Sequence, residues 1–331
     1  MSNTTSAPAA SSWRWKEAFN SARRPLGTLA VLILMMAIFV MANPHAFMRW
    51  STYNSVLITL PVIIFLVVPL TFIVVAGEID LSFPSVMGLA AWFFALVVQV
   101  GYSPWLGLAV ALFSGAVLGW LVGTSVVRLG LSALVATLGM NFMLRGVINI
   151  GSAGHSVAVT SVRESSLATA MTGKLFGVPG QVFWALAFTV FCIFLFFKHR
   201  FGVRVQCVGD NPESASQMGI PVDRVRVQTF IFMGFGAALA GVFSVMINFV
   251  WWPTNGDGYM LPAIAAVFVG GTPTWGGVGT IAGSALGAIL VAFIEVGVVA
   301  AGLSGFYVLF FNGLIILLSL VGHRLHGKRI R

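Results

Sequence analysis

Long uncharged stretches dominate the chain. Residues 27–48, 56–77 and 181–197 contain no Lys, Arg, Asp or Glu. Each approaches or exceeds the roughly 20 apolar residues that a helix needs to cross a hydrocarbon layer about 30 Å thick. The stretches do not alternate polar and apolar residues as the strands of a membrane barrel do. Because backbone groups in lipid must be hydrogen-bonded internally, the pattern predicts an all-α, polytopic bundle of transmembrane helices.

The apolar pattern divides into ten segments, which together predict a single transmembrane domain over residues 26–322. Their approximate bounds are 26–40, 55–76, 83–100, 104–127, 131–150, 181–198, 228–250, 261–271, 279–301 and 304–322. The domain is flanked by a polar, basic N-terminal tail (1–25) and a basic C-terminal tail (323–331). Longer polar loops separate some of the segments, at about 151–180 and 199–227.

The segment 261–271 is too short to cross a membrane, because at 1.5 Å per residue it spans only about 16 Å as a helix. A glycine-rich stretch follows it, so we expect a broken or re-entrant element there. Such irregular backbone is tolerated at membrane depth where protein buries it or water lines it. The glycines act either as a gate hinge or as a tight helix crossing, and we favour close packing combined with a break. They are Gly270, Gly271, Gly276 and Gly277.

Composition and charge placement support this interpretation. The chain is 58% hydrophobic and 8% charged, against roughly 25% charged residues in a typical soluble domain. If the N-terminus is cytoplasmic and the segments alternate, only four of the 18 Lys and Arg residues lie at outer positions, which leaves 14 inside. This is the positive-inside pattern. It predicts that both termini are cytoplasmic, and it attributes the net charge of +9 to membrane orientation rather than to nucleic-acid binding.

The loop 199–227 predicts a short helix over residues 212–218. Asn211 can cap its start and Pro212 fits its first position, while Gly219 is typical of a helix end. The apolar residues of this segment predict a small patch that another protein could grip. They are Ala215, Met218 and Ile220.

A few polar residues within or beside the apolar segments are candidates for a translocation pathway. An ionisable group at membrane depth suggests function, although Asp80 could equally cap the helix that starts near Pro84, and Glu295 could pair with another subunit. The asparagines more commonly join neighbouring helices. The candidates are Glu78, Asp80, Asn141, Glu295 and Asn312.

Other side chains suggest less. Trp251, Trp252 and Trp275 either stack on a substrate or, as is commoner at segment ends, anchor the membrane interface. His45 and His155 have no partners at metal-ligand spacing, so we expect no metal site. The sequence has no G-x-x-x-x-G-K-[ST] motif, so any nucleotide chemistry of the P-loop kind must lie on another chain.

Four sequence blocks resemble the ribose-type, or simple-sugar, permeases of bacterial ATP-binding-cassette importers. The blocks are Gly77-Glu-Ile-Asp-Leu-Ser82 with Pro84-Ser-Val-Met-Gly88, residues 133–146 with their Thr-Leu-Gly and Arg-Gly motifs, residues 209–220 with 222–224, and Ala263 to Thr272 with Gly276 to Thr280. The resemblance runs in order from about residue 55 to 322. It implies a permease of a bacterial inner membrane that carries a monosaccharide or polyol.

The resemblance also implies partners. These are two cytoplasmic ATPases that hold the ATP and magnesium, a second permease of identical or related sequence, and an extracytoplasmic sugar-binding protein. The ATPases would dock on a coupling segment made of Gly209, Asn211, Pro212, Ala215, Met218, Gly219 and Ile220. An alternative is a secondary transporter or channel driven by an ion, for which Glu78 and Glu295 are the only support. An intramembrane enzyme would need a nucleophile with a base or a metal cluster, which the pattern does not suggest.

Overall fold

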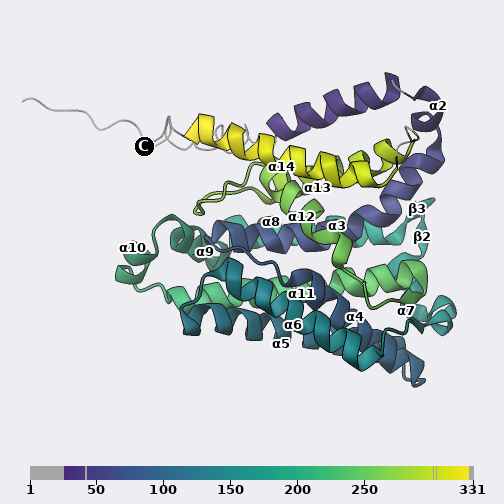
Figure 1. Ribbon diagram of the computed structural model, residues 1–331, viewed down its shortest axis with the longest axis horizontal. Helices are drawn as coiled ribbons and strands as arrows, with labels where there is room; N and C mark the ends of the chain where they lie inside the picture. Colours follow the sequence, from purple (N-terminus) through teal and green to yellow (C-terminus); the bar gives the residue numbers. More distant parts are fainter. Residues whose placement is uncertain (1–25, 42, 301, 303, 328–331) are drawn as a thin grey trace, which may run out of the picture.

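The computed structural model describes residues 26–41, 43–300, 302 and 304–327. The predicted N-terminal tail, and the last residues of the predicted C-terminal tail, lie outside this range. The described part consists almost entirely of helices, which confirms the predicted all-α class. Helices run side by side along the long axis of the molecule (Figure 1).

In the described part of the chain, six helices are long and apolar enough to cross a membrane. They are α3 (Trp50–Val75), α5 (Pro104–Leu129), α6 (Ala133–Ser152), α8 (Gly180–Phe197), α11 (Val222–Asn248) and α13 (Ile281–Ala300). Shorter apolar helices occupy the remaining predicted segments: Leu26–Met41, α4 (Phe83–Gln99), α12 (Met260–Val269) and the first part of α14 (Phe306–Gly327). Each predicted segment therefore corresponds to a helix, while the number that crosses the membrane stays a prediction.

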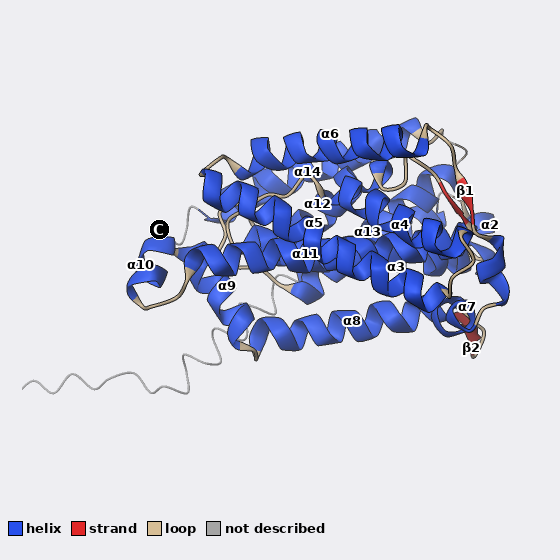
Figure 2. Cartoon of the chain, turned by 90° about the horizontal axis from the view of Figure 1, so that it is seen from below, coloured by secondary structure: helices blue, strands red, loops and turns tan. Residues whose placement is uncertain are grey.

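The predicted polar loops lie at opposite ends of the bundle. The loop 199–227 contains α9 (Arg200–Asp210) and α10 (Pro212–Gln217), which protrude at one end (Figures 1 and 2). The opposite end carries the elements of the other loop. The elements of this loop are β1 (Val157–Ala158), η1 (Thr160–Glu164), α7 (Ser166–Thr172), β2 (Lys174–Leu175) and β3 (Val178–Pro179). The same end also carries α2 (Pro44–Phe47), and β4 (Val250–Trp251) and η2 (Asp257–Tyr259) from the segment between α11 and α12. The strands form two short antiparallel pairs, β1 with β4 and β2 with β3.

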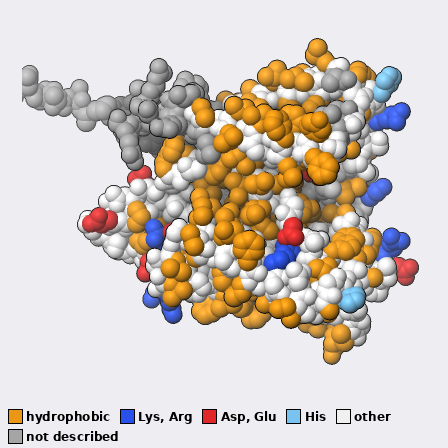
Figure 3. Space-filling model, in the orientation of Figure 1, with side chains coloured by type: hydrophobic (Ala, Val, Ile, Leu, Met, Phe, Trp, Pro, Cys, Tyr) orange, Lys and Arg blue, Asp and Glu red, His pale blue; other side chains and the backbone are white. Residues whose placement is uncertain are grey.

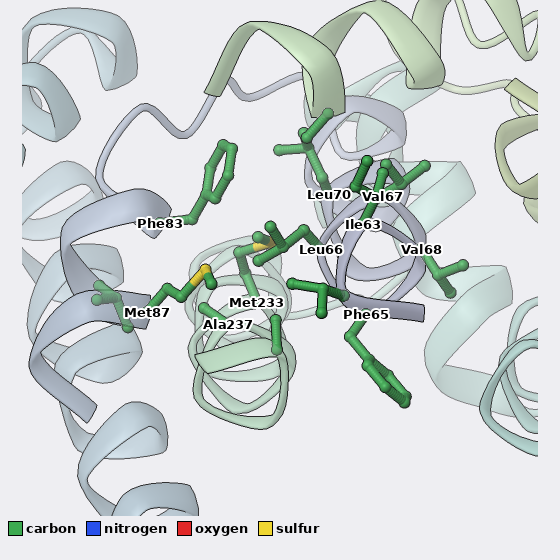
Figure 4. Packing of buried hydrophobic residues seen from close by; sticks show 14 of the residues in the cluster. Ile63, Phe65, Leu66, Val67, Val68, Leu70, Phe83, Met87, Met233 and Ala237 are labelled. Atoms are coloured by element: carbon green, nitrogen blue, oxygen red, sulfur yellow. The ribbon is translucent and has the colours of Figure 1, made fainter. Parts of the chain in front are cut away.

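The helix α3 forms the centre of the core. In its most apolar stretch 89% of the residues are buried, against 17% in α6 at the periphery. A helix that is surrounded by protein is apolar on every side, and α3 has this character. Its Phe65 stacks on Phe243 of α11 with ring centroids 4.8 Å apart. Figure 4 shows α3 side chains facing Met87 of α4 and Met233 of α11.

The neighbouring α5 and α11 cross closely because glycines of α5 face the backbone of α11. A Cβ atom added to Gly119 would lie 3.0 Å from the Cα of Ile231, and one added to Gly115 would overlap the Gly234 carbonyl. Small residues at such crossings let helices approach in lipid. The opposite side of α5 exposes large apolar side chains such as Phe113, and hydrophobic atoms cover the middle of the face seen in Figure 3.

Candidate translocation and coupling site

The short helix α10 forms as the sequence predicts, within one residue of its expected end. The Asn211 side chain caps the helix by accepting a hydrogen bond from the Ser214 amide at 2.9 Å, and Pro212 occupies the first turn. Gly219 follows the helix with φ +78°, a left-handed conformation that costs glycine little. These features determine where α10 begins and ends. The helix lies at the tip of the protruding end (Figure 1).

The predicted apolar patch on α10 is not a single exposed surface. Ala215 is only 2% exposed and belongs to the hydrophobic core. Ile220 is half-buried and packs against the same core, whereas Met218 is 75% exposed. The sequence pattern grouped these residues correctly on one segment, but it could not separate the side that packs inward from the side that faces out. Of these three residues, Met218, which follows the last residue of α10, is therefore the one whose apolar side chain is exposed.

The end of α9 lies against two distant segments, at a contact that we call the junction and define as Val75, Gly209 and Gly277. The Gly277 amide donates a hydrogen bond to the Val75 carbonyl at 2.8 Å. A Cβ atom on Gly209 would lie 2.6 Å from the Gly277 nitrogen and would overlap the Val75 carbonyl oxygen. Position 209 therefore requires glycine because three backbone segments meet there.

The junction joins the coupling segment to two breaks between helices. The first break, residues 76–82, separates α3 from α4, and the second, residues 270–280, separates α12 from α13. Val75 is the last residue of α3, and Gly277 lies within the second break. The end of α9 is therefore in contact with the residue that precedes the first break and with a residue of the second break.

Polar side chains hold the first break in place. Asp80 is 3% exposed and accepts hydrogen bonds from the Ser82 amide at 2.7 Å and the Ser82 hydroxyl at 2.6 Å. Glu78 forms an ion pair of 3.1 Å with Arg226 near the start of α11. Both acidic residues are thus bonded within the protein. Asp80 was also a candidate cap for the helix that begins near Pro84; the N-cap residue of α4 is Ser82, to which Asp80 bonds.

One face of α6 binds the first break and the first turn of α4. The Thr137 hydroxyl accepts a hydrogen bond from the Leu81 amide at 3.0 Å, and the Ser85 hydroxyl donates to the Asn141 side-chain oxygen at 2.6 Å. Asn141 therefore joins two helices, as is usual for such amides.

Arg145 continues this face of α6 toward the other end of the bundle, where it forms an ion pair with Asp257 of η2. Its guanidinium also donates to the backbone carbonyl of Asn255 at 3.2 Å. Thr137 and Arg145 were not among the candidates predicted from the sequence. They lie four positions before and after Asn141, so they share its face of the helix.

The second break depends on glycines and close backbone contact. A Cβ atom on Gly270 would lie 2.5 Å from the Ser284 Cα. Gly271, Gly276 and Gly277 have φ values of 88°, 81° and 75°. This geometry agrees with the favoured interpretation, close packing combined with a break, whereas the alternative of a gate hinge stays a prediction. α12 ends at Val269, as the short segment predicts.

The remaining pathway candidates lie apart from the breaks. Glu295 of α13 lines a cavity of about 270 Å³, whose other lining residues come from α3, η2 and α12. Asn312 of α14 is 1% exposed, and its amide has no hydrogen-bond partner within the described part of the chain. Neither residue forms a hydrogen bond or ion pair with Glu78, Asp80 or Asn141 in the described part of the chain. The five candidates therefore do not form one site.

The tryptophans are divided between core and surface. Trp251 is fully buried, stacks on Trp92 with centroids 5.5 Å apart, and donates to the Gly88 carbonyl at 2.9 Å. It is a core residue, so it neither anchors the membrane interface nor is available to stack on a substrate. Trp252 and Trp275 are 44% and 52% exposed.

Comparisons with known proteins place this arrangement among transport permeases. Residues 52–320 match the family described as "Branched-chain amino acid transport system / permease component". The chain is 30% identical to the ribose import permease protein of Escherichia coli (strain K12) over 296 residues, which cover 89% of this chain and 92% of that one. It is 28% identical to the autoinducer 2 import system permease protein of Salmonella typhimurium (strain LT2) over 311 residues, 91% and 92% of the two chains.

A further relative is the L-arabinose ABC transporter permease protein of Azospirillum brasilense, 27% identical over 297 residues, 89% of this chain and 86% of the relative. These matches confirm the resemblance to ribose-type permeases that the four sequence blocks indicated.

Proposed function

Because the chain belongs to the branched-chain amino acid transport system permease family, we propose that it is the membrane-spanning subunit of an ATP-driven importer for a monosaccharide or related polyol. The family description alone would equally suit an amino-acid carrier. The sugar is supported by the relatives, since one is named for ribose and another for L-arabinose. The chain would form the translocation pathway, and ATP hydrolysis would take place on other subunits.

The proposed topology has ten membrane segments, with both termini in the cytoplasm of a bacterium and α10 on the same side. In support, the described end of α14 lies at the same end of the bundle as α10 (Figure 1). The strands and α7 lie at the opposite end, which would receive the substrate from an extracytoplasmic binding protein. The short helix α12, followed by the second break, would be the re-entrant element.

The junction is the observation that carries the proposal. In this scheme two cytoplasmic ATPases, which hold the ATP and magnesium, dock on α10 and move it. Since α9 and α10 are consecutive, and Gly209 lies against Val75, the last residue before the first break, and against Gly277 of the second break, such movement would reach both breaks through one contact. A second permease, identical or related, would complete the pathway.

Substitution of Met218 by Glu tests the docking surface. Met218 is 75% exposed on the tip, so a charge there leaves the fold intact but opposes an apolar contact. We expect Met218→Glu to reduce co-purification of the cognate ATPase, and ATP-dependent sugar uptake, by about tenfold, as for loss of a central interface residue. Membrane insertion and the melting temperature of the permease should not change.

The matched control is Met48→Glu, because Met48 is 79% exposed and lies beside α2 at the opposite end of the bundle. It should co-purify the ATPase at the wild-type yield. Wild-type yield with Met218→Glu as well would contradict the proposed docking surface.

The ion-driven alternative loses part of its support in the structure. It relied on Glu78 and Glu295, and Glu78 is ion-paired with Arg226. Purified chain reconstituted alone separates the two functions. Sugar uptake driven by a cation gradient, with neither ATPase nor ATP present, would rule out the proposed importer subunit.

A further inference from the structure

The cavity beside Glu295 lies at the end of the bundle opposite α10, between three helices. It is lined by Thr59 and Ile63 of α3, Gly258 and Tyr259 of η2, Pro262 of α12, and Glu295 of α13. Its volume of about 270 Å³ is slightly below the roughly 300–1,000 Å³ of sites for drug-sized ligands. The cavity therefore suits a small molecule rather than a peptide.

Glu295 is an unusual residue for its position. It lies within α13, one of the helices long and apolar enough to cross a membrane. The side chain is exposed and has no hydrogen bond or ion pair with the described residues. Glu295 lines the cavity, whereas Ile294 and Val298, on adjoining sides of α13, are buried in an apolar cluster. A carboxylate at such depth is costly unless it meets a polar partner.

The rest of the lining indicates the chemistry of that partner. Thr59 supplies an exposed hydroxyl and Tyr259 a phenol, whereas Ile63 and Pro262 supply apolar surface. The described lining residues include no Lys or Arg, so the carboxylate of an amino acid would find no cationic side chain among them. A neutral polyol fits better, because its hydroxyl groups can donate to Glu295 while its C–H faces pack on the apolar side chains.

Two helices that line the cavity also connect it to the coupling segment. Pro262 and Glu295 lie on α12 and α13, and these helices are joined by the second break, which contains Gly277 of the junction. A movement of the backbone at the junction would therefore change the position of α12 relative to α13, and with it the shape of the cavity. This arrangement suits a site that holds its ligand only briefly during transport.

We propose that this cavity is a binding subsite for a neutral, polyhydroxylated substrate, with Glu295 as its principal hydrogen-bond acceptor. The inference rests on the proposed function and adds to it the location and chemistry of a substrate contact.

The test uses the complete complex of this chain, its ATPase and its binding protein, reconstituted in liposomes. ATP-dependent uptake of radiolabelled D-ribose, L-arabinose and L-leucine is measured together with ATP hydrolysis. Glu295→Ala should lower the amount of sugar carried per ATP by about tenfold, as expected for loss of a charge-assisted hydrogen bond. Glu295→Gln, which keeps an acceptor oxygen, should recover part of the loss, and Thr59→Val should lower uptake by about threefold.

Two matched control substitutions change residues that do not line the cavity. Glu164→Gln changes an exposed acid of η1, and Thr124→Val changes the hydroxyl of a half-buried residue of α5, which donates to carbonyls of its own helix. Both should carry sugar at the wild-type ratio to ATP. The melting temperature and subunit yield of Glu295→Ala should equal those of the wild type, which separates substrate binding from a structural role.

The outcomes that overturn the inference differ from those that overturn the function. If the wild-type complex carries a sugar and Glu295→Ala carries it equally well per ATP, the subsite is wrong but the importer stands. If the wild-type complex carries L-leucine and neither sugar, the proposed substrate class is wrong and the polyol subsite falls with it.

Discussion

The two breaks between helices meet at the junction, yet different forces hold them. Bonds of polar side chains fix the first break: Asp80 to Ser82 within it, and Glu78 to Arg226 of α11. The second break reaches its neighbours largely through backbone and glycine, as at Gly277. The first break therefore depends mainly on side-chain hydrogen bonds and charge. The second depends mainly on glycines, with added hydroxyl bonds of Thr272 and Thr280 to α13.

This difference predicts different sensitivities. The first break should be damaged by removal of a polar group, because its partners would be left buried without hydrogen bonds. The second should be damaged by addition of atoms, because close-packed interiors resist extra volume. Substitutions of each kind can separate the two cases.

The largest effect is expected from Gly277→Ala. Gly277 has φ +75°, and an added Cβ would lie 2.8 Å from the Cα of Asp210. The left-handed conformation costs alanine about 1–2 kcal/mol, and overpacking adds about 1–3 kcal/mol. We expect a clearly lower melting temperature in detergent and loss of ATP-dependent uptake.

The control for backbone conformation is Gly130→Ala. Gly130 has φ +61°, but no atom lies within 4 Å of its added Cβ. The Gly130→Ala variant should therefore lose only the stability that corresponds to the left-handed conformation, about 1–2 kcal/mol. Equal loss of stability in the two variants would show that the junction is not tightly packed at Gly277.

A smaller effect is expected from Asp80→Ala at the first break. The substitution leaves the amide and hydroxyl of Ser82 without their acceptor in a buried site, which costs roughly 1–3 kcal/mol. The melting temperature should fall, and so should uptake, because the entry to α4 loses its fixed shape. Thermal unfolding of the purified permease measures the change.

Glu164→Ala serves as the control for Asp80→Ala, because Glu164 is an exposed acid outside both breaks. Its effect should be within about 0.5 kcal/mol of zero, as is usual for surface substitutions. If Asp80→Ala were equally harmless, the first break would not depend on its polar bonds.

The sequence predicted the features that are local in the chain. The positions of the apolar helices, the short α12 with its following break, and the bounds of α10 depend on residues within a few positions of one another. Asn211 and Gly219 were sufficient to place α10 because capping is a local interaction. The sequence blocks likewise identified the permease family without the structure.

The features that the sequence did not predict depend on contacts between distant residues. Nothing near Val75 indicates that its carbonyl meets Gly277, and nothing near Glu78 indicates Arg226 as its partner. The inward side of Ala215 and the burial of Trp251 were also missed. In an apolar sequence, hydrophobic residues face protein and lipid alike, so periodicity distinguishes the two poorly.

The central claim is that α10 faces the cytoplasm, where an ATPase can move it. The most direct test is labelling of single cysteines in a chain carrying Cys192→Ala and Cys207→Ala, with a thiol reagent that does not cross membranes. Ser216→Cys, on the exposed side of α10, should react in inside-out vesicles and not in intact cells with an opened outer membrane. Ser156→Cys, exposed at the other end, should show the reverse. Labelling of Ser216→Cys from outside the intact cells would contradict the account.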